Sequence, residues 1–268
     1  MRQPPGGAMV PTPAVGVYLS AGRFEAVVSG LARALTSLAG AGVGQSLRTP
    51  PVIARSIIER VGYHQAFPHL LGSVVDSDLV LLPAGCYCLY PMFEGARLTT
   101  PIEVSIEATC FRQEDSAETG RLRSFRMREF VRLGVGPQCR VWRDDRLTVA
   151  REWLGELGLE TEAVVANDPF FGSGNRLIRA LQREQVLKIE LVATVGPGQR
   201  QAVASGNYHK EQFGAVFEIS EPAGGVAHSA CLAFGYERLA LALMHRHGDD
   251  PWRWPDQVRD MLSLEVRA

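Results

Sequence analysis

Long apolar runs are missing from this sequence, and none approaches the length of a membrane-spanning helix. The opening residues, Met1–Val15, also lack the apolar core of a secretory signal. These absences argue against membrane insertion and export, so we expect a cytoplasmic protein without a membrane partner.

Cysteine is scarce and irregularly spaced. There are five (Cys86, Cys88, Cys110, Cys139 and Cys231), with no Cys-x-x-Cys pair. An odd number at irregular spacing argues against a disulfide framework and indicates reduced thiols. Spacing alone predicts no metal site either, because a buried free cysteine is common.

The chain also has no excess of charge of one sign. It carries 28 Lys and Arg against 29 Asp and Glu, a formal net charge of −1. A general attraction to nucleic acid is therefore not expected, and any basic partner surface must be local. A hydrophobic content of 46% is typical of a globular protein that buries a sizeable core.

Internal repeats are absent as well, and low complexity is confined to the N-terminus. Residues 1–13 are rich in proline and glycine, which predicts a flexible N-terminus. We expect residues 14–268 to form one catalytic domain. The run Gly40–Gly44 lacks a preceding strand and a complete GxGxxG, so we interpret it as a loop.

Apolar periodicity divides the rest into helices and strands. Helical spacing predicts helices over 24–38, 52–61, 145–157, 176–185, 235–247 and 256–262. Alternation predicts strands over 78–82, 159–166, 186–195, 202–207, 215–219 and 226–233. Irregularly spaced strands with hairpin-like pairs indicate an α+β fold, in which helices flank a mainly antiparallel sheet.

The segment Ala108–Gly134 stands out. Alternating apolar residues at its two ends predict a pair of antiparallel strands, joined by a long loop that turns at Gly120. Its charged residues include Arg112, Glu114, Arg121, Arg123, Arg126, Arg128 and Glu129. A solvated sheet face could hold them. Arginine is also the side chain suited to binding phosphate, so a nucleotide site is the alternative.

Two motifs in this region resemble those of the class II aminoacyl-tRNA synthetases. Phe111-Arg112-x-Glu114, a loop and Arg126-x-x-x-Phe130 resemble motif 2, and Ala233–Leu243 is similar to motif 3. The resemblance implies the class II catalytic core, a six-stranded antiparallel sheet flanked by helices.

The resemblance also implies that the protein activates a carboxylic acid with ATP. Arg112 would contact the α-phosphate and the acyl carboxylate, and Glu114 the adenine amino group. Phe130 would stack on adenine, while Arg126 and Arg238 would hold the β- and γ-phosphates. Arg112 and Arg238 would be catalytic. Each has a plainer alternative, such as a core role for Phe130 or a surface charge for Arg238.

Departures from the seryl-tRNA synthetase pattern point to a subtype. Gly134 stands where those enzymes carry a pocket glutamate, and Gln201 where they carry a metal-binding one. The stretches PAGCYCLYP, SFRMREFVRLG and SACLAFGYERLAL instead resemble the zinc-dependent archaeal-type synthetase and its small bacterial relatives, the amino acid:[carrier protein] ligases. Their pattern implies Zn²⁺ on Cys86, Glu129 and Cys231, holding the substrate amine, in addition to ATP and Mg²⁺.

Three further residues belong to this implied substrate site or border it. Cys88 is the alternative to Cys86 as the first zinc ligand. Asn207 matches a polar substrate-binding position. His209 lies beside Asn207 and is at least as readily interpreted as a structural histidine.

The resemblance implies that glycine or alanine is activated as an aminoacyl-adenylate and passed to the phosphopantetheine thiol of a small acidic carrier protein. We expect no tRNA, because no basic, aromatic-rich segment replaces a tRNA-binding domain. A truncated synthetase acting on tRNA and an inactive paralogue with a regulatory role are the alternatives. Retention of all five motif residues argues against the inactive paralogue.

Two surfaces are predicted to bind other chains. Arg176, Arg179 and Arg183 share one side of the helix 176–185, which we interpret as a carrier-protein docking surface, although a solvated face is the plain alternative. The helix Val52–Val61 is similar to class II motif 1, which packs across a two-fold axis. This similarity predicts a homodimer.

Overall fold

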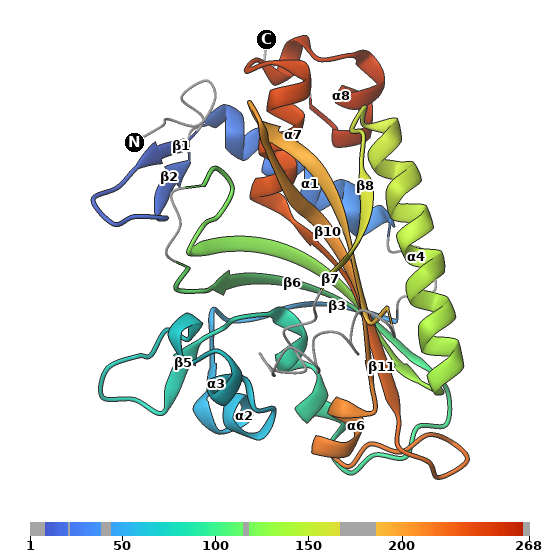
Figure 1. Ribbon diagram of the computed structural model, residues 1–268. Coiled ribbons are helices and arrows are strands. Elements are labelled where there is room, and N and C mark those ends of the chain that lie inside the picture. The colour runs from blue at the N-terminus through green and yellow to red at the C-terminus, as the bar shows by residue number, and fades with distance from the viewer. Residues whose placement is uncertain (1–8, 21, 39–43, 115–117, 167–185, 265–268) are drawn as a thin grey trace.

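The computed structural model describes residues 9–20, 22–38, 44–114, 118–166 and 186–264 (Figure 1). Its main feature is a seven-stranded sheet. In spatial order the strands are β3 (Gln45–Arg48), β6 (Ile102–Phe111), β7 (Ser124–Gly134), β11 (His228–Gly235), β10 (Gln199–Lys210), β9 (Lys188–Gly196) and β8 (Glu162–Ala166). The six strands from β6 to β8 are antiparallel, and β3 adds a parallel edge strand. The predicted α+β fold with an antiparallel sheet is confirmed.

One face of the sheet is covered by long helices. The helix α4 (Gly136–Glu156) runs along β10 and β11, while α1 (Gly22–Leu38), α7 (Tyr236–His247) and α8 (Asp256–Leu262) pack together at one end (Figure 1). The 3-10 turn η6 (Pro251–Arg253) joins α7 to α8. The apolar stripe of α1 is buried here, as its helical spacing predicts.

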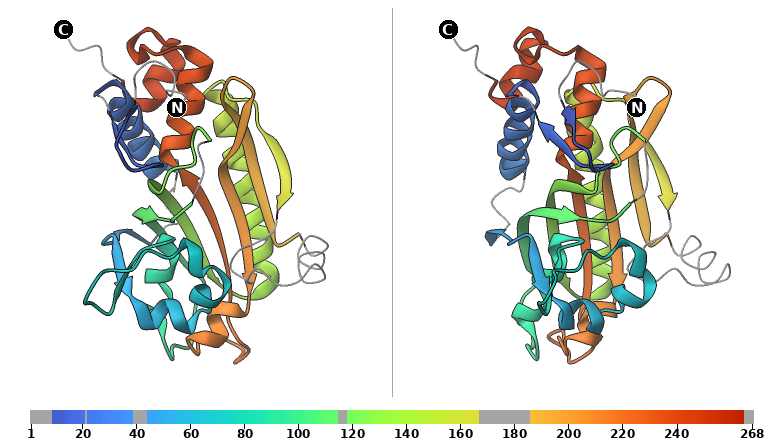
Figure 2. Two further views of the ribbon diagram at one scale, coloured as in Figure 1. Left: turned by 60° about the vertical axis from the view of Figure 1, so that its left-hand side comes forward. Right: turned by 90° about the vertical axis from the view of Figure 1, so that its left-hand side faces the viewer.

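The other face is covered over only part of its length, by short elements in front of the lower half of the sheet (Figure 2). These are β4 (Val52–Ala54), α2 (Arg55–Arg60), α3 (Tyr63–Ala66), η2 (Pro68–Leu70), β5 (Leu79–Leu81), η3 (Gly85–Cys88), η4 (Tyr90–Phe93) and α6 (Gln212–Val216). The part of this face that they leave uncovered holds the cavity described below.

The two faces bury separate apolar cores, and β11 shows how the strand residues divide between them. Ala230, Leu232 and Phe234 pack in the core with α1, α4 and α7. Cys231 and Ala233 pack in the core on the opposite face. Successive side chains on a strand point to opposite faces, so the parity of a residue decides which core it joins.

Several predicted elements are confirmed, and others differ. The predicted helix 52–61 begins only at Arg55, because Val52–Ala54 pairs with Leu79–Leu81 as the two-stranded sheet β4–β5. The strand predicted over 215–219 is wrong, because most of it is the end of α6 and the turn after it. The predicted helix 176–185 lies outside the described residues.

The N-terminal segment is also more ordered than predicted. Met9–Pro11 (β1) pairs with Tyr18–Ser20 (β2), and Met9 is buried. Residues 1–8 of the predicted flexible segment lie outside the described residues. Among those that are described, no helix combines the length and apolar character needed to cross a bilayer.

Candidate functional site

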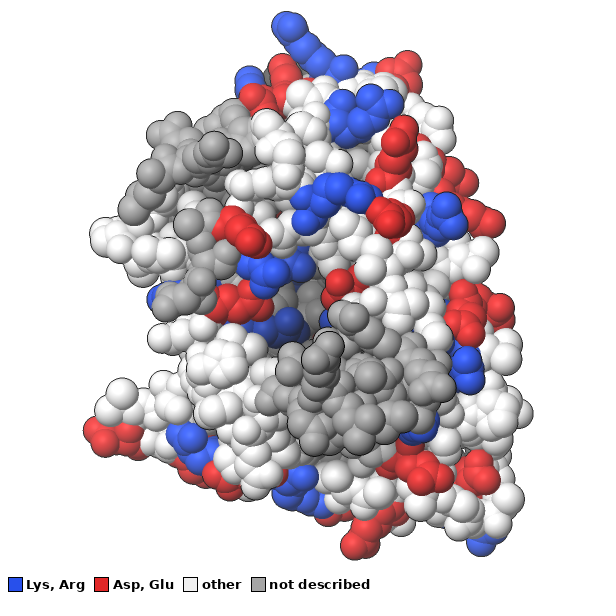
Figure 3. Space-filling view, in the orientation of Figure 1, with Lys and Arg blue, Asp and Glu red and all other residues white. Residues whose placement is uncertain are grey.

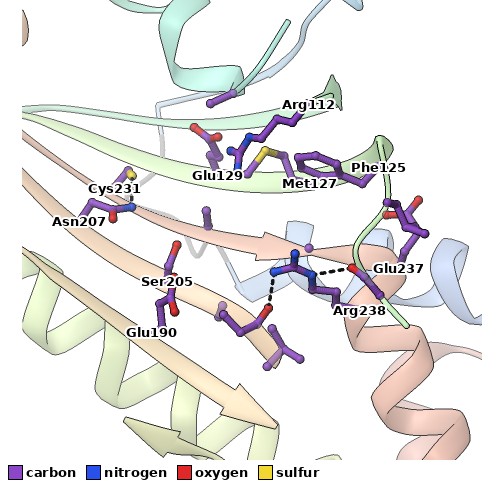
Figure 4. A pocket seen from close by; sticks show the side chains of 18 of the residues that line it. Arg112, Phe125, Met127, Glu129, Glu190, Ser205, Asn207, Cys231, Glu237 and Arg238 are labelled. Carbon is purple, nitrogen blue, oxygen red and sulfur yellow. Dashed lines mark hydrogen bonds between the residues drawn. The ribbon is translucent and has the colours of Figure 1, made fainter. Parts of the chain in front are cut away.

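A cavity opens on the partly covered face of the sheet, between β7, β11, β10 and β9 (Figure 4). It encloses about 910 Å³, part of which is open solvent. In the space-filling view, Lys and Arg atoms gather around a hollow near the middle of the surface (Figure 3).

Strand β7 contributes alternate side chains to this cavity. Phe125, Met127 and Glu129 line it. Arg126 and Phe130 do not, because they have the opposite parity. Phe130 is buried in the other core, edge-to-face with Phe234 at 6.2 Å between ring centroids. The geometry therefore does not support the prediction that Phe130 stacks on adenine in this cavity.

Arg126 is held by two carboxylates instead of facing the cavity. Its Nη atoms donate to both oxygens of Glu25 at 2.7 and 2.8 Å. Its Nε and backbone N–H donate to Glu237 at 2.7 and 2.8 Å. These bonds join the first turns of α1 and α7, so Arg126 has a structural bridging position. The geometry does not support its predicted role on the phosphates either.

One end of the cavity is basic. Arg238 donates from Nε to the carbonyl of Gly120 at 2.8 Å and from Nη1 to that of Ala202 at 3.1 Å. Burial lowers the pKa of Arg238, and Arg112 and Arg121 lower it further, whereas Glu114 opposes them. The positive charges of Arg112 and Arg121 thus disfavour the charged form of Arg238, and a polyanionic ligand would offset this effect.

The two loop residues Arg112 and Glu114 are placed by backbone and side-chain contacts. Arg112 Nε donates to the carbonyl of Pro83 at 3.0 Å, and its guanidinium lies over the ring of Phe125 at 5.2 Å. Glu114 accepts from Arg121 at 3.1 Å. Both Arg112 and Glu114 line the cavity, as the sequence predicts. Gly120 has φ of +82°, a conformation that glycine adopts without strain, so the turn before β7 needs a glycine.

The other end of the cavity is lined by the carboxylate of Glu129 and the sulfur of Cys231, and Cys86 adjoins Glu129. Glu129 accepts from the N–H groups of Gly85 and Cys86, at 3.1 and 2.8 Å. Burial raises the pKa of the Cys86 thiol well above its ordinary value, and the nearby Glu129 and Cys231 raise it further. Burial raises the pKa of Glu129 as well. The three predicted zinc ligands thus lie within electrostatic range of one another.

Asn207 and His209 both reach the sulfur of Cys231. Asn207 Nδ2 donates to Cys231 Sγ at 3.2 Å, and its Oδ1 is buried without a hydrogen-bond partner (Figure 4). His209 Nε2 lies 3.6 Å from the same sulfur. Burial lowers the pKa of His209 to about 3, with Arg143 adding to the effect, so the ring is neutral.

The remaining cysteines lie at different distances from the cavity. Cys88 is half-buried, and burial raises its pKa to about 11, with a contribution from Glu129. Cys110 contacts the sulfur of Met127 at 3.3 Å. Cys139 lies on α4, in the core on the opposite face. Across the part of the chain that the structure describes, no three His, Cys, Asp or Glu side chains are arranged to hold a metal ion.

Comparison with known proteins agrees with this geometry. No family model matches the chain. The chain is 37% identical to amino acid–[acyl-carrier-protein] ligase 1 of Bradyrhizobium diazoefficiens, over 93% of this chain and 86% of that protein. The chain belongs to the amino acid–[acyl-carrier-protein] ligase family.

Solved structures place the ligase fold among seryl-tRNA synthetases. The synthetase of M. kandleri, in complex with tRNASec of A. aeolicus, superposes with a TM-score of 0.83 at 20% identity and covers 96% of this chain. That from Pyrococcus horikoshii, complexed with ATP, superposes with a TM-score of 0.76 at 17% identity and covers 94%. This chain spans 58% of each synthetase chain. These likenesses show the class II fold that the sequence motifs predict.

The ligase cavity also contains residues that the sequence reasoning did not assign. Phe125 takes the place foreseen for Phe130 on the cavity side of β7. The spacing Arg121-x-x-x-Phe125 repeats the Arg-x-x-x-Phe pattern five residues earlier. Glu129 lies four residues after Phe125 and also lines the cavity. Strand parity therefore distinguishes this spacing from the one that begins at Arg126 and ends at Gly134.

Three polar side chains on β9 and β10 were also missed. Lys188 and Glu190 line the cavity and form an ion pair at 2.8 Å, and Ser205 lies opposite Glu190 in the strand register. Alternation in 186–195 predicts the strand, but it does not indicate which face of β9 meets the ligand.

Proposed function

We propose that this protein activates a small amino acid with ATP as an aminoacyl-adenylate and transfers the aminoacyl group to the phosphopantetheine thiol of a carrier protein. One observation carries the proposal. A single cavity has arginines at one end and Glu129 and Cys231 at the other, where Cys86 adjoins Glu129, and Arg112 is close enough to affect the pKa of both Arg238 and Glu129. Such a cavity can bind a nucleotide phosphate and an amino acid side by side.

In the first step a carboxylate oxygen of the amino acid attacks the α-phosphorus of ATP. The new bond is a mixed anhydride, and the bond from the α-phosphorus to the oxygen bridging to the β-phosphate breaks, so pyrophosphate leaves. Arg112 would neutralise charge that develops on the α-phosphate, and Arg238 would hold the departing phosphates. Oriented cations in a partly dry site stabilise such a transition state strongly.

In the second step the thiol sulfur of the carrier attacks the acyl carbon. A thioester forms, the bond to the phosphate oxygen breaks, and AMP leaves with the electron pair. The thiol proton passes to solvent, and we assign no protein base, because an acyl-adenylate is already strongly activated.

For the nucleotide we propose Phe125 on the adenine and Arg121 on the terminal phosphates, in place of Phe130 and Arg126. The spacing of the resemblance supports both residues. The parity of β7 supports Phe125, which lines the cavity, and Arg121 is close enough to lower the pKa of Arg238. Glu114, which lines the cavity, keeps its proposed contact with the adenine amino group, and Arg112 and Arg238 keep theirs with the phosphates.

We propose Cys86, Glu129 and Cys231 as ligands of a Zn²⁺ ion, which would hold the substrate amine. The donor chemistry fits, since two thiolates and a carboxylate leave one position of a tetrahedral ion open. Their environment fits too, because Glu129 and Cys231 raise the pKa of the Cys86 thiol and a cation would reverse that effect. Cys88, which borders the same group, remains the alternative first ligand.

A Mg²⁺ ion held by the protein fits less well. Gln201 stands where the seryl pattern has a metal-binding glutamate, and its amide donates to Glu118 at 3.3 Å. The cavity carboxylate Glu190 is paired with Lys188. We therefore propose that Mg²⁺ enters bound to ATP, and we derive no step from it.

The finer assignments rest on the resemblance. We propose glycine or alanine as the amino acid, a small acidic carrier as the partner, a homodimer as the assembly and the cytoplasm as the location. Arg176, Arg179 and Arg183 remain the proposed docking residues, and they lie outside the described residues.

Amino-acid-dependent ATP–pyrophosphate exchange, run with each amino acid in turn, tests the first step. Transfer of the labelled amino acid to phosphopantetheinylated carriers from the same host, and in parallel to tRNA, tests the second. We expect exchange with glycine or alanine and label on a carrier. Charging of tRNA with no label on any carrier would favour the truncated synthetase, and an absence of exchange with every amino acid would favour an inactive paralogue.

A further inference from the structure

Beneath the proposed zinc site lies a buried polar chain that the mechanism does not use. His209 is fully buried, and its Nδ1 lies 3.0 Å from the hydroxyl of Ser229 and 3.4 Å from that of Tyr90. Its Nε2 lies 3.6 Å from Cys231 Sγ. The imidazole therefore connects two hydroxyl groups to the sulfur of a proposed ligand.

The backbone is shaped to bring this ring beside the sulfur. Asn207 pairs with Cys231 and Tyr208 with Ala230, but the register then shifts, so that Lys210 pairs with Ser229. His209 is the additional residue of the resulting β-bulge, and Lys210 adopts a φ of +53°. Bulges of this kind redirect a side chain and are frequent beside active sites.

Aromatic packing fixes the orientation of the ring and of its hydroxyl partner. Phe213 of α6 stacks on Tyr90 with centroids 4.0 Å apart, and it meets His209 edge-to-face at 5.0 Å. Three elements, η4, β10 and α6, therefore hold the imidazole in place. A buried imidazole needs hydrogen-bond partners for both ring nitrogens, and here Nδ1 faces two hydroxyl groups while Nε2 faces Cys231 Sγ.

A thiolate ligand at Cys231 would decide the tautomer of His209. Hydroxyl groups can both donate and accept, whereas a thiolate only accepts. The contact with a thiolate requires the single hydrogen of the neutral ring on Nε2, and Ser229 and Tyr90 can then donate to Nδ1. Asn207 Nδ2 donates to the same sulfur at 3.2 Å. Cys231 thus has two N–H donors, an environment that stabilises negative charge on the sulfur.

We propose that His209 is a positioning residue of the zinc site, whose Nε2–H orients Cys231 and stabilises it as a thiolate ligand. The inference rests on the proposed zinc site. Second-sphere donors of this kind typically change metal affinity by about 10–100-fold.

The test compares two nearly isosteric substitutions in the full-length protein. Both His209→Gln and His209→Met remove the ring, but only glutamine can donate an N–H to the sulfur. Zinc affinity is measured by competition with a coloured chelator. The charge-transfer band between thiolate and Co²⁺ is recorded in the cobalt-substituted protein.

We expect His209→Met to weaken zinc binding about 10–100-fold and to shift the cobalt band, with His209→Gln remaining near the parent. Equal affinities in all three proteins, or equal losses in both variants, would overturn the proposal, because packing alone would then account for the residue. A parent protein that holds no zinc is a different result, which rejects the metal site itself.

A second variant covers the case in which His209→Met fails to fold. Tyr90→Phe combined with Ser229→Ala removes both hydroxyl groups. The imidazole stays in place, but no hydroxyl group then donates to its Nδ1. Circular dichroism of the metal-free proteins checks the fold. We expect weaker zinc binding by this double variant, and an affinity equal to that of the parent would overturn the proposal.

Discussion

Individual charged residues in this protein divide into those that meet the cavity and those that join elements together. Arg112 and Arg238 line the cavity, whereas Arg126 is bound by two glutamates away from it. All three were assigned to ATP on the basis of the sequence. Residue type and motif spacing selected all three arginines alike. Only the alternation of side chains along β7 shows that Arg126 points away from the cavity.

Arg112 should be the most sensitive of these positions. Because it would neutralise the α-phosphate in a half-buried site, Arg112→Ala is expected to lower the rate of pyrophosphate exchange about 10²–10³-fold. Arg97→Ala serves as the control, since the Arg97 side chain donates to the carbonyl of Pro222 on the exposed surface and does not line the cavity. Exchange within a few-fold of the parent in both variants would rule out the class II mechanism.

The two phenylalanines of β7 offer a matched comparison. Phe125→Leu is expected to raise the KM for ATP several-fold, because a stacking surface for adenine is lost. Phe130→Leu should leave that KM unchanged and lower the stability by about 1 kcal/mol, since Phe130 is a core residue. Steady-state exchange kinetics and thermal unfolding measure the two effects. The opposite result would restore the original assignment of Phe130.

Glu129 should make the metal-free protein sensitive to pH. Burial raises its folded-state pKa above the ordinary value of 4.5, so the folded state holds the proton more tightly. Its contribution to stability is fully present below pH 4.5 and is lost as the pH rises through the folded-state pKa. In the presence of a chelator, Glu129→Gln should therefore stabilise the protein more at pH 8 than at pH 5. Denaturant unfolding at both pH values measures this, with the exposed Glu59→Gln as control. An equal effect of Glu129→Gln at both pH values would contradict the prediction.

At the level of elements, periodicity predicted most helices and strands but not their pairing. The helix 24–38 and the helix 235–247 were found because their apolar faces are long and regular. The segment 52–61 was assigned wholly to a helix because Val52 and Ile53 continue its apolar spacing, and the cross-strand partner of β4 lies more than twenty residues further on. Similarly, the bulge at His209 depends on the register of β10 against β11, which a single segment does not reveal.

Arg126 is predicted to act as a link between elements. Arg126→Met and Glu25→Gln should each lower the stability by about 1 kcal/mol, and the double variant should lose less than the sum, since both remove the same ion pair. Thermal unfolding of the four proteins measures this coupling. The KM for ATP should be unchanged in Arg126→Met, and a large increase would return Arg126 to the phosphate site.

At the scale of the whole molecule, the class II fold followed from two motifs and the alternation between them. The homodimer is still a prediction, made from the similarity of Val52–Val61 to motif 1. In the structure, a helix followed by an edge strand of the main sheet occurs instead at α1 and β3, and the outer edge of β3 is free among the described residues. A free edge is suited to pairing with another chain.

Sedimentation at micromolar concentration should show a dimer. The exposed substitution Ser56→Glu on α2 is expected to weaken it if the interface is the segment 52–61, by burying a charge across the two-fold axis. A parent that sediments as a monomer contradicts the dimer altogether. A dimer unaffected by Ser56→Glu would direct attention to the edge strand β3.

The division of β7 between two faces limits how this protein can change in evolution. Loop residues between Glu114 and Gly120 can be added or removed without altering which side chains of β7 meet the ligand, because the strand begins afterwards. A single-residue insertion between Phe125 and Glu129 would exchange the two faces beyond it, turning an apolar core residue toward ATP and a carboxylate into the core. Related enzymes should therefore vary freely in the length of this loop while keeping an unchanged count of residues from Phe125 to Glu129.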